Sequence, residues 1–427
     1  MNRKTLVVVG LGYVGLPLAQ AASKAQFDVI GLDLNEQVVR GLNSGNSHID
    51  DLHDSDIKKM IDLGFRATND ATCINSADIV VICVPTPLAD DGGPDLGAVL
   101  GSARSIASNL SRNTLVVLES TTFPGTTEGL VLPILQESGL KLDEDFWLAF
   151  SPERIDPGNK HYSIVNTPKI VGGVTPDSSM KAYDFYCEFI ESVITAKGAQ
   201  EAELAKLIEN TYRHINIALV NELAEFCNLL EIDLWNAIDC AASKPFGFQA
   251  FYPGPGVGGH CIPIDPNYLS HHIKKVLGRP FRFVELAQEI NSGMPAYVYS
   301  RVQDILNTQQ KAVNGSKVLL IGVTYKPNIA DQRESPVIPL AQLLLKNGAD
   351  ISYYDPLVEV WNVQGHEFET PSISLESSKS LQNACAMADV VVVLQPHEAI
   401  DLEVVVANAQ TILDTRGVLE DNNVVRM

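Results

Sequence analysis

Short, uninterrupted runs of valine, isoleucine and leucine alternate with helical patterns from the start of the chain, and this alternation restricts the fold more than any other feature. Because the runs are apolar throughout rather than at alternate positions, they predict parallel strands covered on both faces. Helical patterns between the runs complete the βαβ order of a doubly wound sheet. The expected strands are Thr5–Val9, Asp28–Leu32, Asp78–Val84, Thr114–Leu118 and Phe146–Phe150, with helices at Gln37–Asn43, Leu96–Ser108 and Thr126–Glu137.

The same rhythm returns near the other end of the chain, after a long helical stretch. Residues 200–231 hold helical periodicity without Gly or Pro, and a helix of about 30 residues spans about 45 Å. From Gly315 onward we expect further strands, whereas 358–380 indicates only a loop and a short helix. The later strands are expected at Lys317–Gly322, Ile351–Tyr354, Asp389–Leu394 and Thr411–Leu413.

These patterns predict an α/β protein with two Rossmann-like doubly wound domains joined by a helical middle domain with a long central helix. A chain of 427 residues is too long for one ordinary core, which agrees with several domains of about 100–200 residues each. We place the first Rossmann-like domain at 1–195, a helical central and dimerisation domain at 196–300, and the second Rossmann-like domain at 301–427.

Charge and cysteine usage exclude several classes of protein. The net charge of -21 repels phosphate backbones and anionic lipid, so we expect no nucleic-acid partner and no membrane partner. The seven cysteines are scattered and form no CxxC pair, which is typical of a reducing compartment and not of a disulfide framework or a zinc site. We therefore expect a cytoplasmic protein without a metal.

The motif VVVGLGYVG places Gly10, Gly12 and Gly15 between a strand and a helix. The first glycine permits a tight turn, the second lets a pyrophosphate approach the backbone, and the third lets helix and strand pack closely. Asp33 ends the second strand, where it should accept from ribose hydroxyls and repel a 2′-phosphate, which favours NAD over NADP. A ligand-free glycine turn and a flavin site are the alternatives. The second Rossmann-like region lacks the fingerprint, since VTYKPN follows Gly322.

The stretch YPGPGVGGHCIPIDP presents Cys261 on a loop rich in glycine and proline. A lone cysteine is more often an inert buried thiol, but a thiolate beside a dinucleotide can add to an aldehyde, after which hydride can leave the thiohemiacetal. His260 is either the neighbour that lowers the thiol pKa or a structural residue. The two lack partners at the spacing of metal ligands.

Polar residues elsewhere suggest the walls of a site. Lys206, Asn210 and Arg213 follow one another at helical spacing and lie either on a solvated face or in a site wall, while Glu203 and Glu209 of the same helix indicate some ordinary surface. Glu153 and Thr121 each follow a predicted strand, at the sheet edge where catalytic loops usually lie.

Together these segments resemble the nucleotide-sugar 6-dehydrogenases, the UDP-glucose/GDP-mannose dehydrogenase family. The resemblance covers residues from about 5 to about 417. It rests on GLGYVG, VPTP, ESTTFPGT, SPERIDPGN, AELAKLIENTYR, GVGGHCIPIDP and YKPNIADQRESP, in that order. It implies oxidation of a sugar CH2OH to a carboxylate by two NAD+, in a cleft between the domains, and a homodimer built on the long helix. Cys261 would hold the thiohemiacetal and then the thioester, and Glu153 would activate the water that hydrolyses the thioester.

The resemblance also assigns the remaining roles. The implied catalytic residues are Thr121, Glu153, Lys206, Asn210, Cys261 and Asp265. The implied NAD contacts are Gly10, Gly12, Tyr13, Val14, Gly15, Asp33, Pro85, Thr86, Thr121 and Arg333. The implied UDP-sugar contacts are Glu153, Arg154, Lys206, Asn210, Arg213, Phe251, Tyr252, Gly254, Gly258 and Lys326. Lys326 and Arg333 also give this acidic protein a local basic patch for a diphosphate.

Two departures bear on the sugar. Ile264 stands where members acting on UDP-glucose commonly carry Lys, and the aromatic segment GFQAFYPG replaces an Arg-containing one. The aromatic rings either lie beside an acetamido methyl group or pack a domain junction. Both departures are similar to the bacterial branch acting on UDP-N-acetylglucosamine, which supplies a uronic acid for surface polysaccharide. UDP-glucose, UDP-N-acetylgalactosamine and UDP-N-acetylmannosamine are alternative substrates.

Two other classes of protein compete with this interpretation. A two-electron NAD dehydrogenase of the hydroxyacid type would not need Cys261. A catalytically dead NAD sensor or scaffold would bind NAD and reduce none of it.

Overall fold

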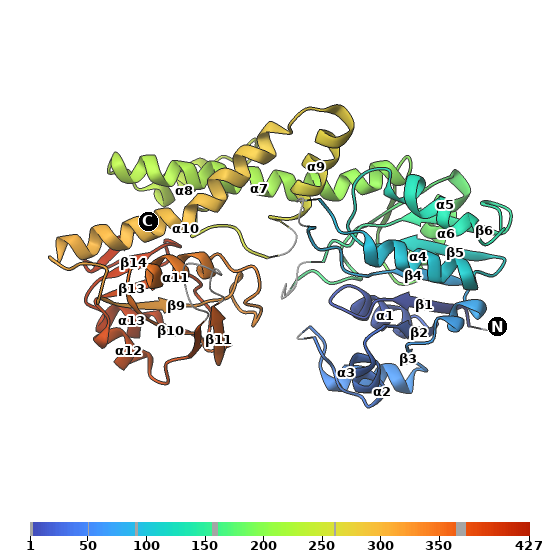
Figure 1. The fold of residues 1–427 in the computed structure, drawn as a ribbon, viewed down its shortest axis with the longest axis horizontal. Coiled ribbons are helices and arrows are strands. Elements are labelled where there is room, and N and C mark those ends of the chain that lie inside the picture. Colours follow the sequence, from blue (N-terminus) through green and yellow to red (C-terminus); the bar gives the residue numbers. More distant parts are fainter. Residues whose placement is uncertain (1–2, 50, 90–92, 156–160, 260–261, 364–372) are drawn as a thin grey trace. The chain divides into compact units, whose positions relative to one another are not determined.

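The structure is a computed structural model that describes residues 3–49, 51–89, 93–155, 161–259, 262–363 and 373–427. The chain divides into two compact units. The first unit comprises Met1–Glu209 and Asn267–Arg279, and the second comprises Asn210–Pro266 and Pro280–Met427. Figure 1 labels elements of both units where there is room.

The first unit is built on one sheet with strand order β3-β2-β1-β4-β5-β6-β7-β8. Strands β1 to β6 pair in parallel, β7 is antiparallel to β6, and β8 is parallel to β7. This is the order of a dinucleotide-binding Rossmann sheet. The strands are β1 Thr5–Val9, β2 Asp28–Leu32, β3 Arg66–Thr68, β4 Ile79–Ile82, β5 Thr114–Leu118, β6 Phe146–Phe150, β7 Lys169–Gly173 and β8 Val193–Thr195.

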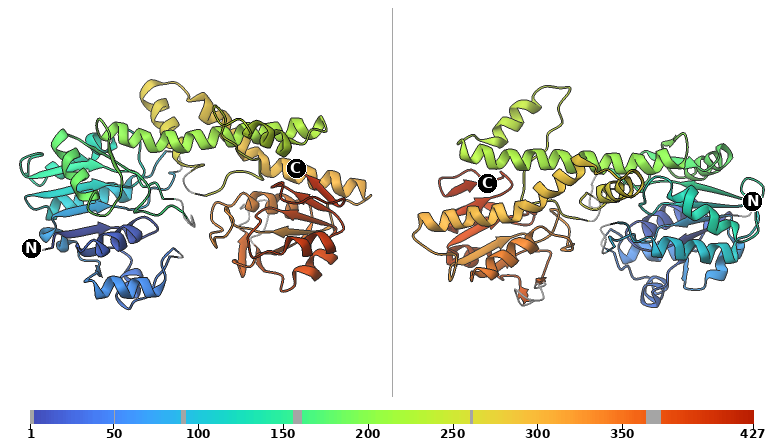
Figure 2. Two further views of the ribbon diagram at one scale, coloured as in Figure 1. Left: turned by 180° about the vertical axis from the view of Figure 1, so that it is seen from behind. Right: turned by 45° about the horizontal axis from the view of Figure 1, so that its top comes forward.

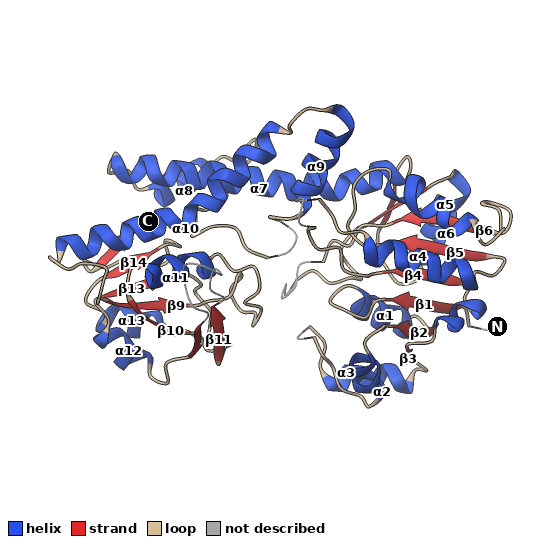
Figure 3. Ribbon diagram, in the orientation of Figure 1, coloured by secondary structure: helices blue, strands red, loops and turns tan. Residues whose placement is uncertain are grey.

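Helices cover both faces of this sheet because its strands are apolar on both sides. Leu6 and Val8 of β1 belong to one buried cluster, whereas Val7 and Val9 belong to another. Figure 3 shows the strands layered with helices. The helices of the first unit are α1 Gly15–Lys24, α2 Glu36–Asn43, α3 Asp54–Asp62, α4 Gly97–Asn109, α5 Leu132–Gln136, α6 Pro176–Tyr186 and, from Asn267 onward, α9 Asp265–Leu277, with the 3-10 helix η1 Ala71–Ser76.

The helix predicted at Thr126–Glu137 is irregular in the structure. It begins as a π-helical turn, η2, at Thr127–Val131 and continues as α5 at Leu132–Gln136. Pro133 lies in the first turn of α5, and proline lacks the N–H that a regular helix would direct at the fourth preceding carbonyl. A wider turn before the proline accommodates this missing donor, and such turns occur often at functional sites.

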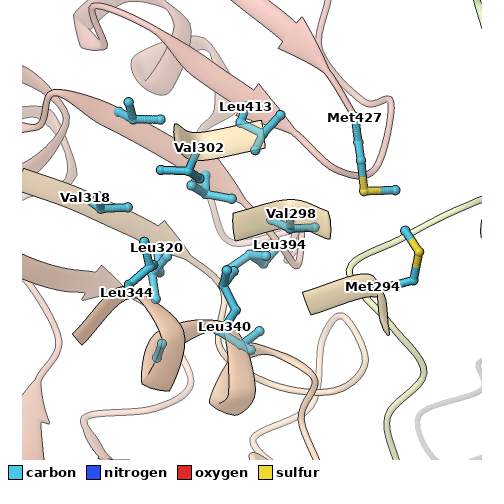
Figure 4. Packing of buried hydrophobic residues seen from close by; sticks show 14 of the residues in the cluster. Met294, Val298, Val302, Val318, Leu320, Leu340, Leu344, Leu394, Leu413 and Met427 are labelled. Carbon is cyan, nitrogen blue, oxygen red and sulfur yellow. The ribbon is translucent and has the colours of Figure 1, made fainter. Parts of the chain in front are cut away.

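The second unit contains a parallel sheet with strand order β10-β9-β13-β14-β15. Its largest cluster packs Met294, Val298 and Val302 of a long helix against strand residues such as Leu320 (Figure 4). The elements are α8 Leu234–Ala242, α10 Arg282–Thr308, β9 Lys317–Ile321, α11 Val337–Lys346, β10 Asp350–Tyr354, α12 Leu381–Met387, β13 Val390–Val393, α13 Leu402–Asn408, β14 Ile412–Asp414 and β15 Val424–Arg426.

The predicted long helix is α7, Ala199–Leu229, with 31 residues. The boundary between the two units falls inside this helix, after Glu209, and Figure 2 shows α7 as one continuous helix. Two Rossmann-like sheets and a helical middle part with a long central helix confirm the predicted fold class. No helix among the described residues is long and apolar enough to cross a membrane.

The expectation for 358–380 was wrong in its described part. Val360–Val363 and Ile373–Glu376 form the antiparallel strands β11 and β12, and the next helix, α12, begins at Leu381. Alternate residues Trp361 and Val363 are buried in the main cluster of the second unit. The strand signal is therefore a period-two pattern in a short segment, which is easily overlooked.

Candidate functional site

The turn after β1 contains glycines with two different functions. At Gly10 φ is +90°, and a Cβ would lie 2.8 Å from the carbonyl oxygen of Cys83. At Gly15 a Cβ would lie 1.9 Å from the carbonyl oxygen of Gly10. No described atom lies within 4 Å of the corresponding position at Gly12. Packing of the protein itself therefore requires the first and third glycines, whereas the second leaves space in which a pyrophosphate can approach the backbone.

The groups around this turn fit a dinucleotide. Among the described residues no side chain caps the N-terminus of α1, so its N–H groups can receive a phosphate. Asp33 follows β2, and its two carboxylate oxygens accept the N–H groups of Leu11 at 3.0 Å and Asn35 at 2.8 Å. These bonds orient the carboxylate, and each oxygen keeps a further lone pair for a ribose hydroxyl. Tyr13 is 38% exposed beside the start of the helix, which follows Val14.

The residues after β4 form a second edge of the site. Pro85 is exposed, and the carbonyl of Thr86 accepts a hydrogen bond from the hydroxyl of Tyr268 on α9. Cys83 lies just before them and is buried. Burial raises the pKa of the Cys83 thiol well above its usual value, so this cysteine is a packing residue and a poor nucleophile.

A buried ammonium group lies on α7. Lys206 is 7% exposed, and its Nζ donates to Thr121 Oγ1 at 2.6 Å. Thr121 belongs to the segment after β5, so the contact joins two residues that the sequence places in separate motifs. Lys206 therefore faces the carboxyl edge of the first sheet and is not a solvated surface residue.

Glu203 corrects the expectation that it is an ordinary surface residue. It is 1% exposed and accepts three hydrogen bonds, from Gly125 N at 2.6 Å, Thr127 N at 2.8 Å and Thr127 Oγ1 at 2.7 Å. Burial raises its pKa to about 7, although these hydrogen bonds oppose the rise. Glu203 lies one helical turn before Lys206, so α7 binds the 121–127 segment at both of its ends.

Glu153 lies just beyond β6, near two ammonium groups. Its carboxylate accepts a hydrogen bond from the N–H of Ile155. Burial raises the pKa of Glu153, whereas the charges of Lys206 and Lys169 oppose the rise. A carboxylate whose pKa is moved toward neutrality is suited to take a proton from water.

A charged cluster behind Glu153 escaped the sequence reasoning. Lys169 Nζ lies 2.9 Å from Glu119 Oε2, both side chains are buried, and the hydroxyl of Tyr186 also donates to Glu119. The available signal was an acidic residue directly after the strand Thr114–Leu118, which is apolar from its second residue onward. A carboxylate at the end of a buried strand needs a cationic partner nearby.

Arg154 and Arg213 have different surroundings. The guanidinium of Arg154 forms an ion pair with Glu209 at 2.7 Å and donates to the carbonyl of Pro168 at 2.6 Å. Arg213 is exposed on α7, whereas Lys206 and Asn210 are buried. The expected polar stripe therefore divides into a buried part and an exposed end.

In the second unit, Asn210 and Asp265 form a close pair. Asn210 Nδ2 donates to Asp265 Oδ2 at 2.6 Å, and both side chains are at most 9% exposed. The expected nucleophile Cys261 and its neighbour His260 lie outside the described residues.

The segment before the cysteine packs closely on the second unit. A Cβ at Gly258 would lie 2.6 Å from Tyr325 Cβ, and one at Gly254 would lie 2.6 Å from Arg416 Nη1. Phe251 packs edge to face on Tyr212, with ring centroids 5.8 Å apart. Tyr252 is 46% exposed, and its hydroxyl donates to Asp239.

The expected basic pair lies on the loop after β9. Arg333 binds Asp331 through two side-chain hydrogen bonds of 2.9 and 2.8 Å. The carbonyl of Lys326 accepts from Thr324 Oγ1 at 2.8 Å, which holds the turn carrying this lysine. Both residues belong to the second unit, whereas the glycine turn belongs to the first.

Comparison with protein families gives matches along most of the chain. Residues 4–190 match the NAD binding domain of the UDP-glucose/GDP-mannose dehydrogenase family, residues 200–293 match its central domain, and residues 319–421 match its UDP binding domain.

Individual relatives agree with these matches. A UDP-N-acetyl-D-mannosamine dehydrogenase of Methanococcus maripaludis is 34% identical and covers 98% of this chain and 94% of its own length. A UDP-N-acetyl-D-glucosamine 6-dehydrogenase of Pseudomonas aeruginosa is 35% identical and covers 86% of each chain. The solved structure of a UDP-D-ManNAc dehydrogenase from Pyrococcus horikoshii is 29% identical, covers 99% of this chain and 98% of its own, and has a TM-score of 0.88.

Proposed function

This chain belongs to the UDP-glucose/GDP-mannose dehydrogenase family, and we propose that it oxidises C6 of a UDP-N-acetylhexosamine, foremost UDP-N-acetylglucosamine, from CH2OH to the carboxylate. The uronic acid would serve a surface polysaccharide. The observation that carries the proposal is the buried Lys206 ammonium on Thr121, with the carboxylate of Glu153 within its electrostatic reach.

NAD is the cofactor of the first unit, in agreement with the open position at Gly12 and the oriented carboxylate of Asp33. When bound, NAD+ accepts one hydride in each of two oxidations, so complete reaction of one sugar consumes two NAD+ and one water.

In the first oxidation, the C6 hydroxyl loses its proton to water while the carbon becomes an aldehyde. Lys206 would stabilise the developing alkoxide, because an ammonium in a site that excludes water lowers the energy of nearby negative charge. Thr121 holds that ammonium in place at 2.6 Å. Asn210 follows Lys206 by one turn of α7, and its side-chain amide is oriented by Asp265. It would supply a second hydrogen-bond donor to the same oxygen.

In the second oxidation, the thiolate of Cys261 would add to the aldehyde carbon and form a C–S bond. Loss of hydride from the thiohemiacetal gives a thioester. Glu153 would then take a proton from a water molecule while the oxygen of that water attacks the thioester carbonyl. Collapse of that adduct breaks the C–S bond and releases the carboxylic acid and the thiolate.

The sugar is the finer part of the proposal, and a second candidate is UDP-N-acetylmannosamine. Relatives named for each substrate have nearly equal identity to this chain, 34% for the mannosamine enzyme and 35% for the glucosamine enzyme. The aromatic segment 246–252 favours an N-acetylated sugar, because Phe246 and Phe248 remain 72% and 44% exposed and offer apolar surface for an acetamido methyl group.

The decisive experiment measures NADH formed per molecule of limiting UDP-sugar, run to completion with excess NAD+. We expect a ratio near two with UDP-N-acetylglucosamine, and parallel runs with UDP-N-acetylmannosamine, UDP-N-acetylgalactosamine and UDP-glucose rank the alternatives. Cys261→Ser should abolish complete turnover, because an alcohol cannot replace the thiolate as nucleophile and leaving group.

A ratio near one with every sugar would mean that the reaction stops at the aldehyde, and would remove the assigned roles of Cys261 and Glu153. Full activity of Cys261→Ser would favour a two-electron dehydrogenase. NAD binding without NADH formation from any of these sugars would favour a sensor protein.

We also propose a homodimer that uses α7. Apolar residues spaced seven, four and three positions apart remain exposed along it: Tyr212, Leu219, Leu223 and Phe226, at 47%, 54%, 38% and 53%, and Leu230, directly after its end, is 67% exposed. Such a stripe is the seam of a helix packed on another helix. Analytical ultracentrifugation of the wild type and Phe226→Asp tests this, and a monomeric wild type would contradict it.

A further inference from the structure

A chain of buried amide groups links two helices of the second unit to the segment that precedes Cys261. Asn221 of α7 is 0% exposed, and Asn291 of α10 is 4% exposed. Asn221 Nδ2 donates to Asn291 Oδ1 at 2.9 Å, and Asn221 Oδ1 accepts the backbone N–H of Gly254 at 3.0 Å. The chain of amides therefore ends on the main chain of an irregular segment rather than on another side chain.

The other end of this chain of amides is held by α7 itself. Asn291 Nδ2 donates to the carbonyl of His214 at 3.2 Å and lies 3.3 Å from His214 Nδ1. These contacts set the orientation of the Asn291 amide, which points its oxygen at Asn221. The orientation of each amide thus determines that of the next, so that the oxygen of Asn221 is the atom presented to Gly254.

These amides lie beside the largest apolar cluster, where hydrophobic side chains would stabilise the fold more simply. Val220, Ala224 and Met294 are near them in sequence and belong to that cluster. His214 Nε2 is buried without a hydrogen-bond partner among the described residues. Buried polar groups that are retained at such a cost commonly specify one conformation of the chain around them.

The segment from Pro253 to Gly259 has no regular secondary structure, so its conformation depends on such contacts. Gly254 is bound to Asn221, and at the other end the N–H of Gly259 donates to the carbonyl of Glu334 at 3.3 Å. Between them Gly256 has φ +130°, and a Cβ there would lie 2.9 Å from Pro336 Cβ and in ordinary contact, at 3.4 Å, with the Asn291 carbonyl oxygen. Pro295 is inside α10 and, lacking an N–H, donates no hydrogen bond to that carbonyl.

We propose that Asn221, aligned by Asn291, is a positioning residue that sets the path of the 253–259 segment and thereby the placement of the thiol that follows it. The inference rests on the proposed function, since it assigns a purpose to this segment in the same reaction. It predicts that a change at either amide has the same effect, although only Asn221 accepts a hydrogen bond from the segment.

The first test is Asn221→Ala, which removes the acceptor for Gly254. We expect kcat/KM for the UDP-sugar to fall about 10- to 100-fold, because small misplacements of reacting groups have effects of this size. NAD affinity should stay at the wild-type value. Asn216→Ala is the matched control, since the Asn216 amide, on the same helix, donates to the carbonyl of Tyr212 at an exposed position.

A readout independent of turnover is the rate at which iodoacetamide alkylates Cys261, followed by peptide mass spectrometry. Exposed Cys187 and Cys240 serve as internal references. Asn221→Ala should change the rate at Cys261 and leave the reference rates unchanged, with all assays run well below each variant's Tm.

Asn291 variants test the coupling and remain informative if Asn221→Ala does not fold. Asn291→Ala should reproduce the loss, and the double variant should be no worse than either single one, because the residues act in series. Asn291→Asp should not recover the activity, because its carboxylate can accept from Asn221 but cannot donate to the His214 carbonyl that orients residue 291.

The inference is overturned if the Asn221 and Asn291 variants keep wild-type kcat/KM and Cys261 alkylation while only their Tm falls. Additive losses in the double variant would also overturn it. Failure of the proposed function has a different signature: Cys261→Ser would be fully active, while the alkylation rates would still report whether the amides position the segment.

Discussion

The two Rossmann-like sheets of this chain begin with the same turn and differ in the residues beyond that turn. Gly10 follows β1 with φ +90°, and Gly322 follows β9 with φ +76°. The N–H of Gly10 donates to the carbonyl of Leu32 at 2.8 Å, and the N–H of Gly322 donates to that of Tyr354 at 3.0 Å. In both sheets the glycine therefore binds the end of the neighbouring strand in the same way.

The aspartates after those neighbouring strands also correspond. Asp33 accepts the N–H of Leu11 at 3.0 Å, and Asp355 accepts the N–H of Val323 at 2.8 Å. However, Asp33 is partly exposed, whereas Asp355 is 2% exposed and lies 3.1 Å from His397 Nε2. The carboxylate of Asp33 can therefore accept from a ribose hydroxyl, whereas that of Asp355 is occupied by contacts with the protein's own groups.

The loops and helices after the turn complete the difference. In the first unit the open position at Gly12 is followed by α1 at Gly15, whereas in the second unit α11 begins only at Val337. The intervening loop carries Lys326 and Arg333. The same strand–turn–strand arrangement can therefore serve different ligands, because the ligand meets the loop and helix after the turn and not the turn itself.

The largest expected effects come from Gly10→Ala and Gly322→Ala. Each position has a positive φ, and a Cβ would lie 2.8 Å from the Cys83 carbonyl oxygen or 2.2 Å from that of Gln395. Each variant should lose about 3 kcal/mol in the unfolding free energy of its own unit. Gly10→Ala should weaken NAD binding alone, and Gly322→Ala should weaken UDP binding alone. Scanning calorimetry measures the unfolding, and titration calorimetry measures the affinities for NAD and UDP. A variant that loses affinity for both ligands would contradict the comparison.

A smaller effect is expected from Gly12→Ala, which sharpens the distinction between packing and ligand access. Since no described atom lies within 4 Å of the added Cβ, stability should stay within about 0.5 kcal/mol of wild type. NAD affinity should fall about tenfold or more, equivalent to about 1.4 kcal/mol. Isothermal titration and thermal unfolding measure the two quantities, and unchanged NAD affinity would mean that the pyrophosphate does not approach at Gly12.

The third set of effects concerns pH, and the two units should respond in opposite directions. Burial raises the pKa of Glu203 from 4.5 to about 7 in the first unit and lowers that of His214 from 6.5 to about 4 in the second. Folded Glu203 binds more protons than the unfolded chain between pH 4.5 and 7, so its contribution to stability falls as pH rises. Folded His214 binds fewer protons between pH 4 and 6.5, so its contribution increases over that range.

Glu203→Gln and His214→Gln test these signs through the change in unfolding free energy between about pH 5 and pH 7. The unfolding free energy at pH 7 minus that at pH 5 should be more positive in Glu203→Gln than in the wild type. In His214→Gln it should be less positive, and each difference should be about 1–3 kcal/mol. Equal slopes in both variants and the wild type would show that neither group titrates differently in the folded state.

Much of the fold is predictable from local pattern. The strands at Thr5–Val9, Asp28–Leu32 and Phe146–Phe150 have the bounds that the pattern predicts, because strands buried on both faces are apolar without interruption. The helix at 200–231 is predictable nearly to its ends, since so long a stretch without Gly or Pro leaves little alternative. The period-two signal at 360–363 is too short to distinguish a strand from a loop with a short helix.

For the site, residue type and spacing were enough to identify the available chemistry: the glycine turn, Asp33, Glu153, Lys206 and the thiol loop are all recognisable in the sequence. Only the tertiary structure shows which polar residues of distant segments bind one another. The fold buries Glu203 on the 121–127 segment, pairs Lys169 with Glu119, and joins Asn221 and Asn291 to Gly254. Periodicity reports which face of an element is apolar, but a buried polar side chain is explained by its partner, and that partner lies tens of residues away in the chain.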